Sequence, residues 1–330
     1  MRLAFTSQSS HKAAQALRNG HLVSFPTETV YGLGADATND QAVAKIYAAK
    51  GRPSFNPLIA HVASLEQAQD YGVFNKQSLE IASHFWPGAL TLVVPIKENS
   101  AISNLVTAGL DSLALRIPAP QNVRDLITLA DRPIAAPSAN LSGRISPTTA
   151  NHVESYLDKA CAYILDDGPC AAGLESTIID VRSGKIHILR PGPITRQMIE
   201  NACPDIAFAT TEMTPNDQDE PALVNDTSPT APGQMTSHYA PNKAVRLNVT
   251  TPKAGDIYIG FGACAQEAMF NLSPSGDLVE AAAQLFSILH KADQLVGAEI
   301  AIAPIPKHGI GLAIYDRLQR AAADRPGRSV

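Results

Sequence analysis

The chain has 330 residues, which exceeds one average core, so we expect two domains. Its apolar content of 45% and charged content of 17% are typical of an ordinary globular protein. A net charge of -5 excludes bulk attraction to nucleic acid or to an anionic membrane, although it leaves room for a local basic cleft.

The first third of the chain opens with a short strand and an amphipathic helix that ends at Gly20. A strand over residues 21–25 should stop at Pro26, because proline cannot donate to a sheet ladder. The hydroxyl- and glycine-rich segment 27–34 should then form a loop. A helix should follow, with Asp40 as its N-cap and Gly51 as its stop.

Alternation of strands and helices continues to about residue 202, which indicates an α/β or α+β sheet. Strands are expected at residues 58–62, 90–95, 112–117, 134–136 and 162–165, and as a hairpin at 176–181 and 185–189. A short helix is expected after Ser64, which would be its N-cap. Further helices are expected at residues 76–85, 122–130, 149–156 and 195–202.

Composition shifts after residue 203. Residues 204–237 are rich in Pro, Thr, Asp and Asn and have little periodicity, which favours a long linker. Alternation resumes with strands at 256–261 and 300–303 and helices at 277–295 and 312–323, and the tail 325–330 should be frayed. We therefore predict an N-terminal catalytic domain over 1–203, a linker or lid over 204–241 and a small C-terminal α/β domain over 242–330.

The four cysteines are scattered and form no C-x-x-C pair: Cys161, Cys170, Cys203 and Cys264. This spacing argues against structural zinc or a disulfide framework and favours a cytoplasmic protein. The N-terminus lacks an apolar signal region, and no window of ~18 apolar residues could span a bilayer.

Several polar residues could carry chemistry, but each also has an ordinary structural explanation. Lys50 and Arg52 could grip a polyphosphate, or could simply complement a helix dipole. Ser138 and Asn140 alternate in a polar loop and could point the same way, although a turn explains them equally well. His61, inside a strand, is by itself more typical of a satisfied core histidine.

Arg116 is more informative because it interrupts the apolar strand SLALRI. A lone buried charge is costly, so this arginine should have an acidic partner. That partner is either a carboxylate of the protein or a ligand carboxylate held by the guanidinium fork, and the spacing does not decide between them.

Eight motifs together resemble the YrdC-type threonylcarbamoyl-AMP synthase family: PTETVYGLG, KGRP, NPLIAH, ALRIP, PSANLSG, ESTIID, LRPG and, in the linker, SHYAP. The resemblance covers about residues 20–198, and SHYAP is similar to the segment found in the longer, two-domain synthases. It implies a twisted mixed sheet with flanking helices, plus a small Rossmann-like three-layer C-terminal domain.

The resemblance also implies a reaction. Family members join L-threonine, bicarbonate and ATP to give threonylcarbamoyl-AMP and pyrophosphate. The product passes to the machinery that makes N6-threonylcarbamoyladenosine in transfer RNA. Mg²⁺ is expected on the nucleotide phosphates, without protein side chains as ligands, and no strong direct nucleic-acid binding is expected.

Site residues follow from the resemblance by position. The catalytic group, which would hold the triphosphate and its metal, is Lys50, Arg52, Ser138 and Asn140. Further ATP-binding positions are Asn56, Ser112, Ser146, Arg190 and Tyr239. Threonine-binding positions are Thr27, His61, Arg116, Ala136 and Ser176. For Arg116 the resemblance favours a ligand carboxylate, whereas Asn56 is also explained by a turn.

Two other functions fit the residues less well. A nucleic-acid-binding module without catalysis conflicts with the negative charge and with the lack of interleaved basic and aromatic residues. A carbamoyltransferase of the hydrogenase-maturation type would carry zinc-finger cysteines that this chain lacks. For the synthase, an Arg116 that lies far from Lys50 and Ser138, or that an internal acid already neutralises, would count against the assignment.

Overall fold

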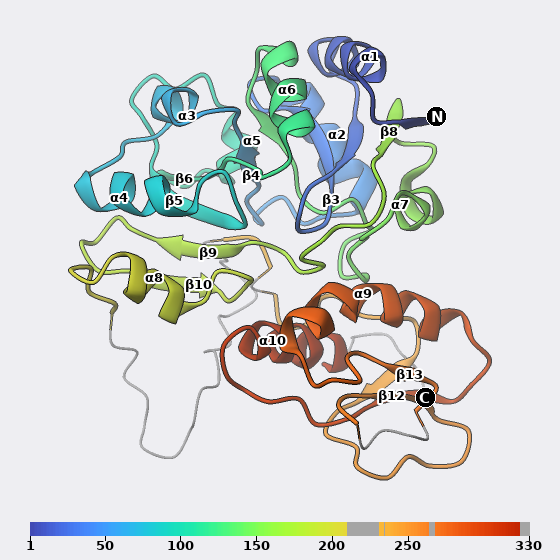
Figure 1. The fold of residues 1–330 in the computed structure, drawn as a ribbon. Coiled ribbons are helices and arrows are strands. Elements are labelled where there is room, and N and C mark those ends of the chain that lie inside the picture. Colours follow the sequence, from blue (N-terminus) through green and yellow to red (C-terminus); the bar gives the residue numbers. More distant parts are fainter. Residues whose placement is uncertain (210–230, 234, 264–267, 324–330) are drawn as a thin grey trace.

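A computed structural model describes residues 1–209, 231–233, 235–263 and 268–323. Most of the predicted linker, together with Cys264 and the tail 325–330, lies outside the described residues. The chain forms a large unit built on one sheet and a small unit packed below it (Figure 1). Among the described helices, none combines the length and apolarity needed to cross a membrane.

The large unit is organised around a mixed ten-stranded sheet of order β1-β8-β2-β3-β7-β4-β6-β5-β9-β10. Its strands are β1 (Arg2–Ala4), β2 (Val23–Pro26), β3 (Tyr31–Asp36), β4 (Ile59–His61), β5 (Leu90–Pro95), β6 (Ser112–Arg116), β7 (Ile134–Ala135), β8 (Tyr163–Asp166), β9 (Thr177–Asp180) and β10 (His187–Arg190). Its helices are α1 (Ser7–Arg18), α2 (Asp40–Lys50), α3 (Leu65–Tyr71), α4 (Lys76–Phe85), α5 (Asn104–Thr107), α6 (Gln121–Ala130), α7 (Ala150–Leu157) and α8 (Arg196–Ala202).

Most predicted elements are confirmed to within two residues, but the glycine-rich segment is not the predicted loop. Residues 31–36 form β3, which pairs antiparallel with β2, and Pro26 itself pairs with Tyr31. A Cβ on Gly34 would lie 2.6 Å from the Phe25 ring and 2.9 Å from Ile134. The glycine is therefore needed for close packing inside the sheet, rather than for loop flexibility.

Helix α2 ends as predicted, but its N-cap lies one residue earlier than predicted. The N-cap is Asn39, whose side chain accepts a hydrogen bond from the Ala42 amide, so the prediction of Asp40 as the cap was wrong. Asp40 is the first helical residue, where its charge complements the helix dipole. Gly51 caps the C-terminus in the left-handed conformation, which fixes the direction in which the following residues leave the helix.

Side chains alternate between the two faces of the central strands, and this alternation positions the site. On β6, Leu113 and Leu115 join the main hydrophobic core, whereas Ala114 packs with Ile59 on the opposite face. Arg116 therefore belongs to the same face as Ile59 and Ala114, because side chains repeat every second residue. A polar patch consequently occupies one end of an otherwise apolar sheet face.

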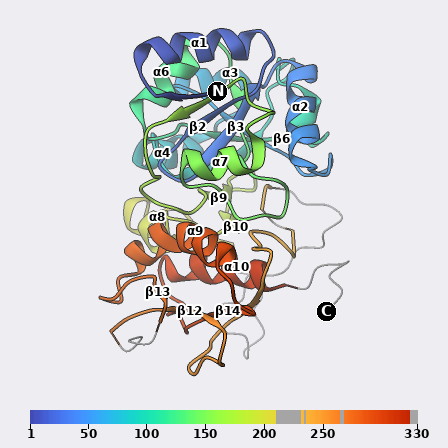
Figure 2. The same ribbon diagram turned by 90° about the vertical axis from the view of Figure 1, so that its right-hand side faces the viewer.

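The small unit has a parallel sheet of order β11-β14-β12-β13 and two helices. Its elements are β11 (Ala244–Arg246), β12 (Ile257–Gly260), β13 (Phe270–Asn271), α9 (Leu278–Gln294), β14 (Glu299–Ile302) and α10 (Gly311–Ala322). Helices α9 and α10 lie between this sheet and the large unit (Figure 2). Val30, Ile145 and Leu174 of the large unit belong to the same hydrophobic core as Phe286 of α9, so the two units share apolar packing.

Candidate functional site

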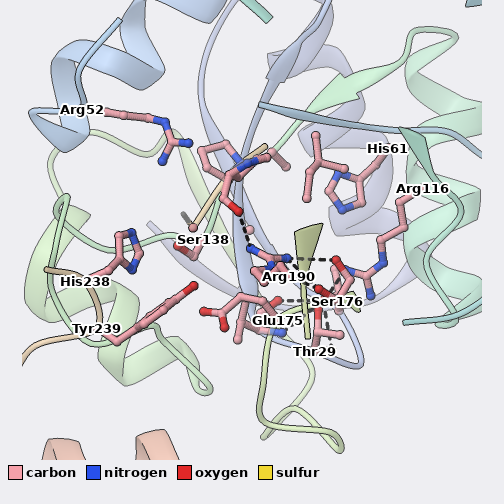
Figure 3. A pocket seen from close by; sticks show the side chains of 18 residues that line it. Thr29, Arg52, His61, Arg116, Ser138, Glu175, Ser176, Arg190, His238 and Tyr239 are labelled. Carbon is pink, nitrogen blue, oxygen red and sulfur yellow. Dashed lines mark hydrogen bonds between the residues drawn. The ribbon is translucent and has the colours of Figure 1, made fainter. Parts of the chain in front are cut away.

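A cavity lies between the polar end of the large sheet and the described part of the linker. Its cavity volume is about 50 Å³, which is well below the ~300–1,000 Å³ of typical small-molecule sites, so the site is narrow in this conformation. Figure 3 shows Arg52, His238 and Tyr239 on one side and His61 and Arg116 on the other. Ser138, Glu175, Ser176 and Arg190 lie between them, so the cavity has two chemically distinct ends.

Nine of the sequence-predicted residues line this cavity: Thr27, Arg52, His61, Arg116, Ala136, Ser138, Ser176, Arg190 and Tyr239. Five do not line it: Lys50, Asn56, Ser112, Asn140 and Ser146. Four of those five, Lys50, Asn56, Asn140 and Ser146, lie outside the cavity and hold its lining residues or loops in place, as described below. Ser112 begins β6, four residues from Arg116, and strand geometry places it roughly 13 Å away along the strand.

The end of the cavity that contains Arg116 is set by strand register and by a tight turn. β4 and β6 run parallel with His61 opposite Arg116, so both side chains come to the same place on the sheet face. In the turn between β2 and β3, the Thr27 hydroxyl donates to the Val30 carbonyl at 2.7 Å and accepts from the Thr29 amide at 3.2 Å. Burial, followed by the charge of Arg116, lowers the pKa of His61 to about 3, so the ring is a neutral lining group.

Arg116 is 3% exposed and already has partners of the protein itself. Its Nε donates to the Gly88 carbonyl at 3.1 Å, and its Nη1 donates to the Thr29 hydroxyl at 2.9 Å. Its Nη2 lies 2.6 Å from Oε1 of Glu28, an ion pair that lacks good hydrogen-bond geometry. Of the two partners that the sequence left open, the structure contains the internal acid. This is the outcome named above as counting against Arg116 as the ligand of a substrate carboxylate, although Arg116 does line the cavity.

Two buried cations line the rest of the cavity, Arg52 at the other end and Arg190 in the middle. Arg52 is 8% exposed and Arg190 is 4% exposed, and burial lowers the pKa of both, that of Arg52 to about 10. Arg52 is oriented by Asn56, whose side-chain oxygen accepts from its Nη2 at 2.6 Å. Each of these guanidiniums would gain from an anion, because the protein supplies them mainly with carbonyl groups.

Lys50 stands behind this end of the cavity rather than in it. Its ammonium donates to the backbone carbonyls of Ser138 and Asn140 and thereby holds the polar loop after β7. Burial, together with the nearby charge of Arg52, lowers the pKa of Lys50 well below its ordinary value. This lysine therefore supports the loop that carries Ser138.

The loop also offers a buried oxygen without a partner. The amide nitrogen of Asn140 donates to the carbonyls of Leu141 and Arg144, whereas its Oδ1 has no hydrogen-bond partner and is buried. Oxygen is the donor that Mg²⁺ prefers. No cluster of three or more acidic, histidine or cysteine side chains suited to a metal occurs among the described residues. The donor set therefore fits an ion carried mainly by phosphate groups.

The described part of the linker covers the cavity with Pro232, Gly233, His238 and Tyr239. Tyr239 is 1% exposed, stacks on Phe286 at 5.6 Å and has a positive φ of 61°, which is costly for a residue with a side chain. The prediction that a tyrosine of the linker reaches the site is consistent with this placement. The same segment forms one wall of the cavity.

Two buried charged residues at the site escaped the sequence analysis. Glu175 lines the cavity and directly precedes Ser176, and its place at the start of the ESTIID motif was a signal that could have been used. It accepts hydrogen bonds from the Ser146 hydroxyl and from Nε of Arg317, which is on α10. Arg317 lies in a separate domain, and no local pattern marks it.

Comparison with known proteins gives a consistent result along the whole chain. Residues 15–192 match the family Sua5_yciO_yrdC, described as "Telomere recombination". Residues 194–323 match the family Sua5_C, described as "Threonylcarbamoyl-AMP synthase, C-terminal domain".

Individual relatives share both parts. The chain is 39% identical to the threonylcarbamoyl-AMP synthase of Bacillus subtilis, over 95% of this chain and 93% of the relative, and 38% identical to that of Pyrococcus abyssi, over 95% and 94%. Its fold matches the crystal structure of P. abyssi Sua5 complexed with L-threonine, with a TM-score of 0.85 and 35% identity, over 98% of this chain and 96% of that one.

Proposed function

The chain belongs to the Sua5/YciO/YrdC family, in the two-domain form that carries the Sua5 C-terminal domain, and from this premise we propose that it is a threonylcarbamoyl-AMP synthase. It joins L-threonine, bicarbonate and ATP to give threonylcarbamoyl-AMP and pyrophosphate. The product then supplies the modification of transfer RNA, and the reaction takes place in the cytoplasm. The three described cysteines are free and buried, which agrees with a reducing compartment.

The observation that carries this proposal is the group of buried cations at one end and in the middle of the cavity. Arg52 and Arg190 line it, and Lys50 supports its wall. Burial lowers the pKa values of Lys50 and Arg52 most, and a neighbouring cation lowers each further, Arg52 for Lys50 and Arg190 for Arg52. Bringing these charges together therefore costs free energy in the absence of a ligand. A polyanion such as a nucleotide triphosphate relieves that cost, which makes the site selective for such a ligand.

The opposite end of the cavity suits an amino acid. Ser176 and Thr27 offer hydroxyl groups, neutral His61 offers a polar ring, and Ala136 leaves room for a small side chain. Arg116 takes the threonine carboxylate with N–H groups that Gly88, Thr29 and Glu28 do not use. The ion pair with Glu28 means that this arginine is oriented before the substrate binds, at the cost of weaker attraction for a second carboxylate.

Catalysis then depends on positioning and on charge neutralisation. The carbamate oxygen of threonine attacks the α-phosphorus, and negative charge accumulates on the phosphate oxygens. Arg52 and Arg190 compensate that charge, while Lys50 keeps the Ser138 loop in place. Magnesium, when bound with the nucleotide near the oxygen of Asn140 and the Ser138 hydroxyl, supplies further charge neutralisation. The linker excludes water from a carbamate that is labile in it.

The test is threonine-dependent release of pyrophosphate from ATP in the presence of bicarbonate. Arg52→Ala and Lys50→Ala should each reduce the rate by about 100-fold or more, as expected for lost transition-state charge stabilisation. Arg132→Ala, which removes an arginine whose side chain is 46% exposed, is the matched control and should keep wild-type rates. Pyrophosphate release near the wild-type rate in both site variants would contradict the assignment, and RNA binding without turnover would favour the binding module.

A further inference from the structure

One arginine of the small unit contacts the wall of the cavity from outside. Arg317 of α10 is fully buried, and its Nε donates to Oε2 of Glu175 at 2.9 Å. Its Nη1 donates to Asp316 at 2.6 Å, and its guanidinium carbon lies 5.2 Å from the centroid of the Tyr239 ring. A single side chain thus joins α10 to a cavity-lining carboxylate and to the linker tyrosine.

The neighbouring residues strengthen the same connection. Asp316 also accepts from Nε of Arg320 at 2.9 Å. Arg320 in turn donates through Nη1 to the Met235 carbonyl at 2.7 Å, and its own carbonyl accepts from the His238 amide at 3.2 Å. The described part of the linker is therefore hydrogen-bonded to α10 next to Arg317.

Glu175 is difficult to explain in a cavity for a polyanion unless its charge is neutralised. It is 6% exposed and lines the same cavity as Arg52 and Arg190. A buried carboxylate would repel triphosphate oxygens, or would withdraw one of the cations that they need. Arg317 provides the opposing charge from outside the cavity, and the Ser146 hydroxyl orients Oε1 by donating a hydrogen bond to it.

We propose that Arg317 is a positioning residue of the synthase: it neutralises and orients Glu175, and supports Tyr239, so that the nucleotide binds beside this carboxylate. This inference rests on the proposed function, since it takes the ligand to be ATP. It gives the small unit a definite role, which is to complete the nucleotide end of the site. Burial alone would lower the pKa of Arg317, but the neighbouring Tyr239, Glu175 and Asp316 raise it above its usual value, so the side chain stays charged.

The experiment compares Arg317→Met, Glu175→Gln and the double variant, with ATP binding measured by calorimetry and the KM values for ATP and threonine measured by pyrophosphate release. Arg317→Met should weaken ATP binding by about tenfold or more, which corresponds to ~1.4 kcal/mol, because it leaves the buried charge of Glu175 uncompensated beside the nucleotide. The KM for threonine should change by less than about threefold, since Arg116 lies at the other end of the cavity.

The double variant distinguishes neutralisation from general support of the fold. Removing the carboxylate as well should restore ATP binding to within about threefold of wild type, which loss of packing alone would not do. Arg246→Gln, which removes a surface arginine of the same unit that pairs with Asp256 and Glu299, is the charge-matched control. If Arg317→Met does not fold, Arg317→Gln, which keeps two N–H donors, takes its place with the same expectations.

Unchanged ATP binding in the Arg317 variants would overturn the inference, and so would a double variant no better than Arg317→Met alone. Weaker ATP binding in Glu175→Gln would also overturn it, because the carboxylate would then contribute to nucleotide binding. Failure of the proposed function is recognised separately, by wild-type protein that binds ATP but releases no pyrophosphate when threonine and bicarbonate are added.

Discussion

Substitution of Gly233 by alanine should open the covered site without disturbing the large sheet. Gly233 lies in the described part of the linker with a φ of +83°, a conformation that residues with a Cβ rarely adopt. A Cβ there would lie 2.7 Å from the Tyr239 hydroxyl and 3.0 Å from Nη1 of Arg190. Both neighbours are buried and packed, so neither can move away without breaking its own contacts.

The magnitude follows from these two costs. The left-handed conformation costs alanine ~1–2 kcal/mol, and overpacking against fixed neighbours costs a further ~1–3 kcal/mol. The covered arrangement should therefore be destabilised by about 2–5 kcal/mol relative to an open one, a shift of roughly 30- to 5,000-fold in that equilibrium. Because the contacts that this Cβ would disturb are local to Gly233, most of the cost should appear in binding and turnover rather than in global unfolding.

The assay is steady-state pyrophosphate release, together with hydrogen exchange of the linker amides. Gly233→Ala should lower kcat/KM for ATP by about 30-fold or more and should accelerate exchange at Tyr239 and Ala240. Gly184→Ala is the matched control, because Gly184 has a φ of +75° and a Cβ added there would meet nothing within 4 Å, so it carries the conformational cost alone. A wild-type kcat/KM in Gly233→Ala, or an equal loss in Gly184→Ala, would refute the reasoning.

Three further outcomes are expected. Arg116→Met should raise the KM for threonine by about 100-fold, because it removes charge-assisted hydrogen bonds worth ~1.5–3 kcal/mol each. Calorimetry should show nearly unchanged ATP binding. An equal loss of affinity for both substrates would contradict a dedicated role of Arg116 in threonine binding. Gly34→Ala should destabilise the fold by about 1–3 kcal/mol in urea unfolding, because its Cβ would meet Phe25 and Ile134, and an unaltered midpoint would show that the sheet can relax. Burial lowers the pKa of His61 to about 3 and that of His290 to about 4, so the unfolded chain binds more protons below its own histidine pKa. The free energy of unfolding should consequently fall between about pH 6.5 and pH 4, by up to ~1.4 kcal/mol per pH unit for each histidine, and pH-independent urea midpoints over that range would exclude this linkage.

The sequence predicted the elements well where periodicity and end signals agree. Residues 76–85 and 90–95 have the predicted bounds, because a clear helical repeat and an apolar run are each followed by a recognisable breaker. Gly32 and Gly34 led to a wrong prediction, since glycine is typical of loops and the sequence does not show that the Phe25 ring packs against these positions of the strand. Packing across the sheet, and not local preference, decides that segment.

The site was predictable to the extent that its residues lie in local motifs. Arg116 was recognised as an exceptional charge within a strand, but its partner Glu28 could not be identified, because the pairing depends on the β2–β3 turn and the strand register. Lys50 was placed in the right region, yet its contact with two backbone carbonyls depends on the path of a loop 88 residues away. The contact of Arg317 with Glu175 depends on how the two units pack together, and no local stretch of sequence predicts that packing.

The shared hydrophobic core of the two units has a consequence for heat denaturation. Val30, Ile145 and Leu174 pack with Phe286 in one continuous cluster, so melting the small unit would expose apolar surface on the large one. The cost of that exposure couples the two melting events. Scanning calorimetry should accordingly record one endotherm rather than two, and the polypeptide should behave as a single cooperative body despite its long connecting segment.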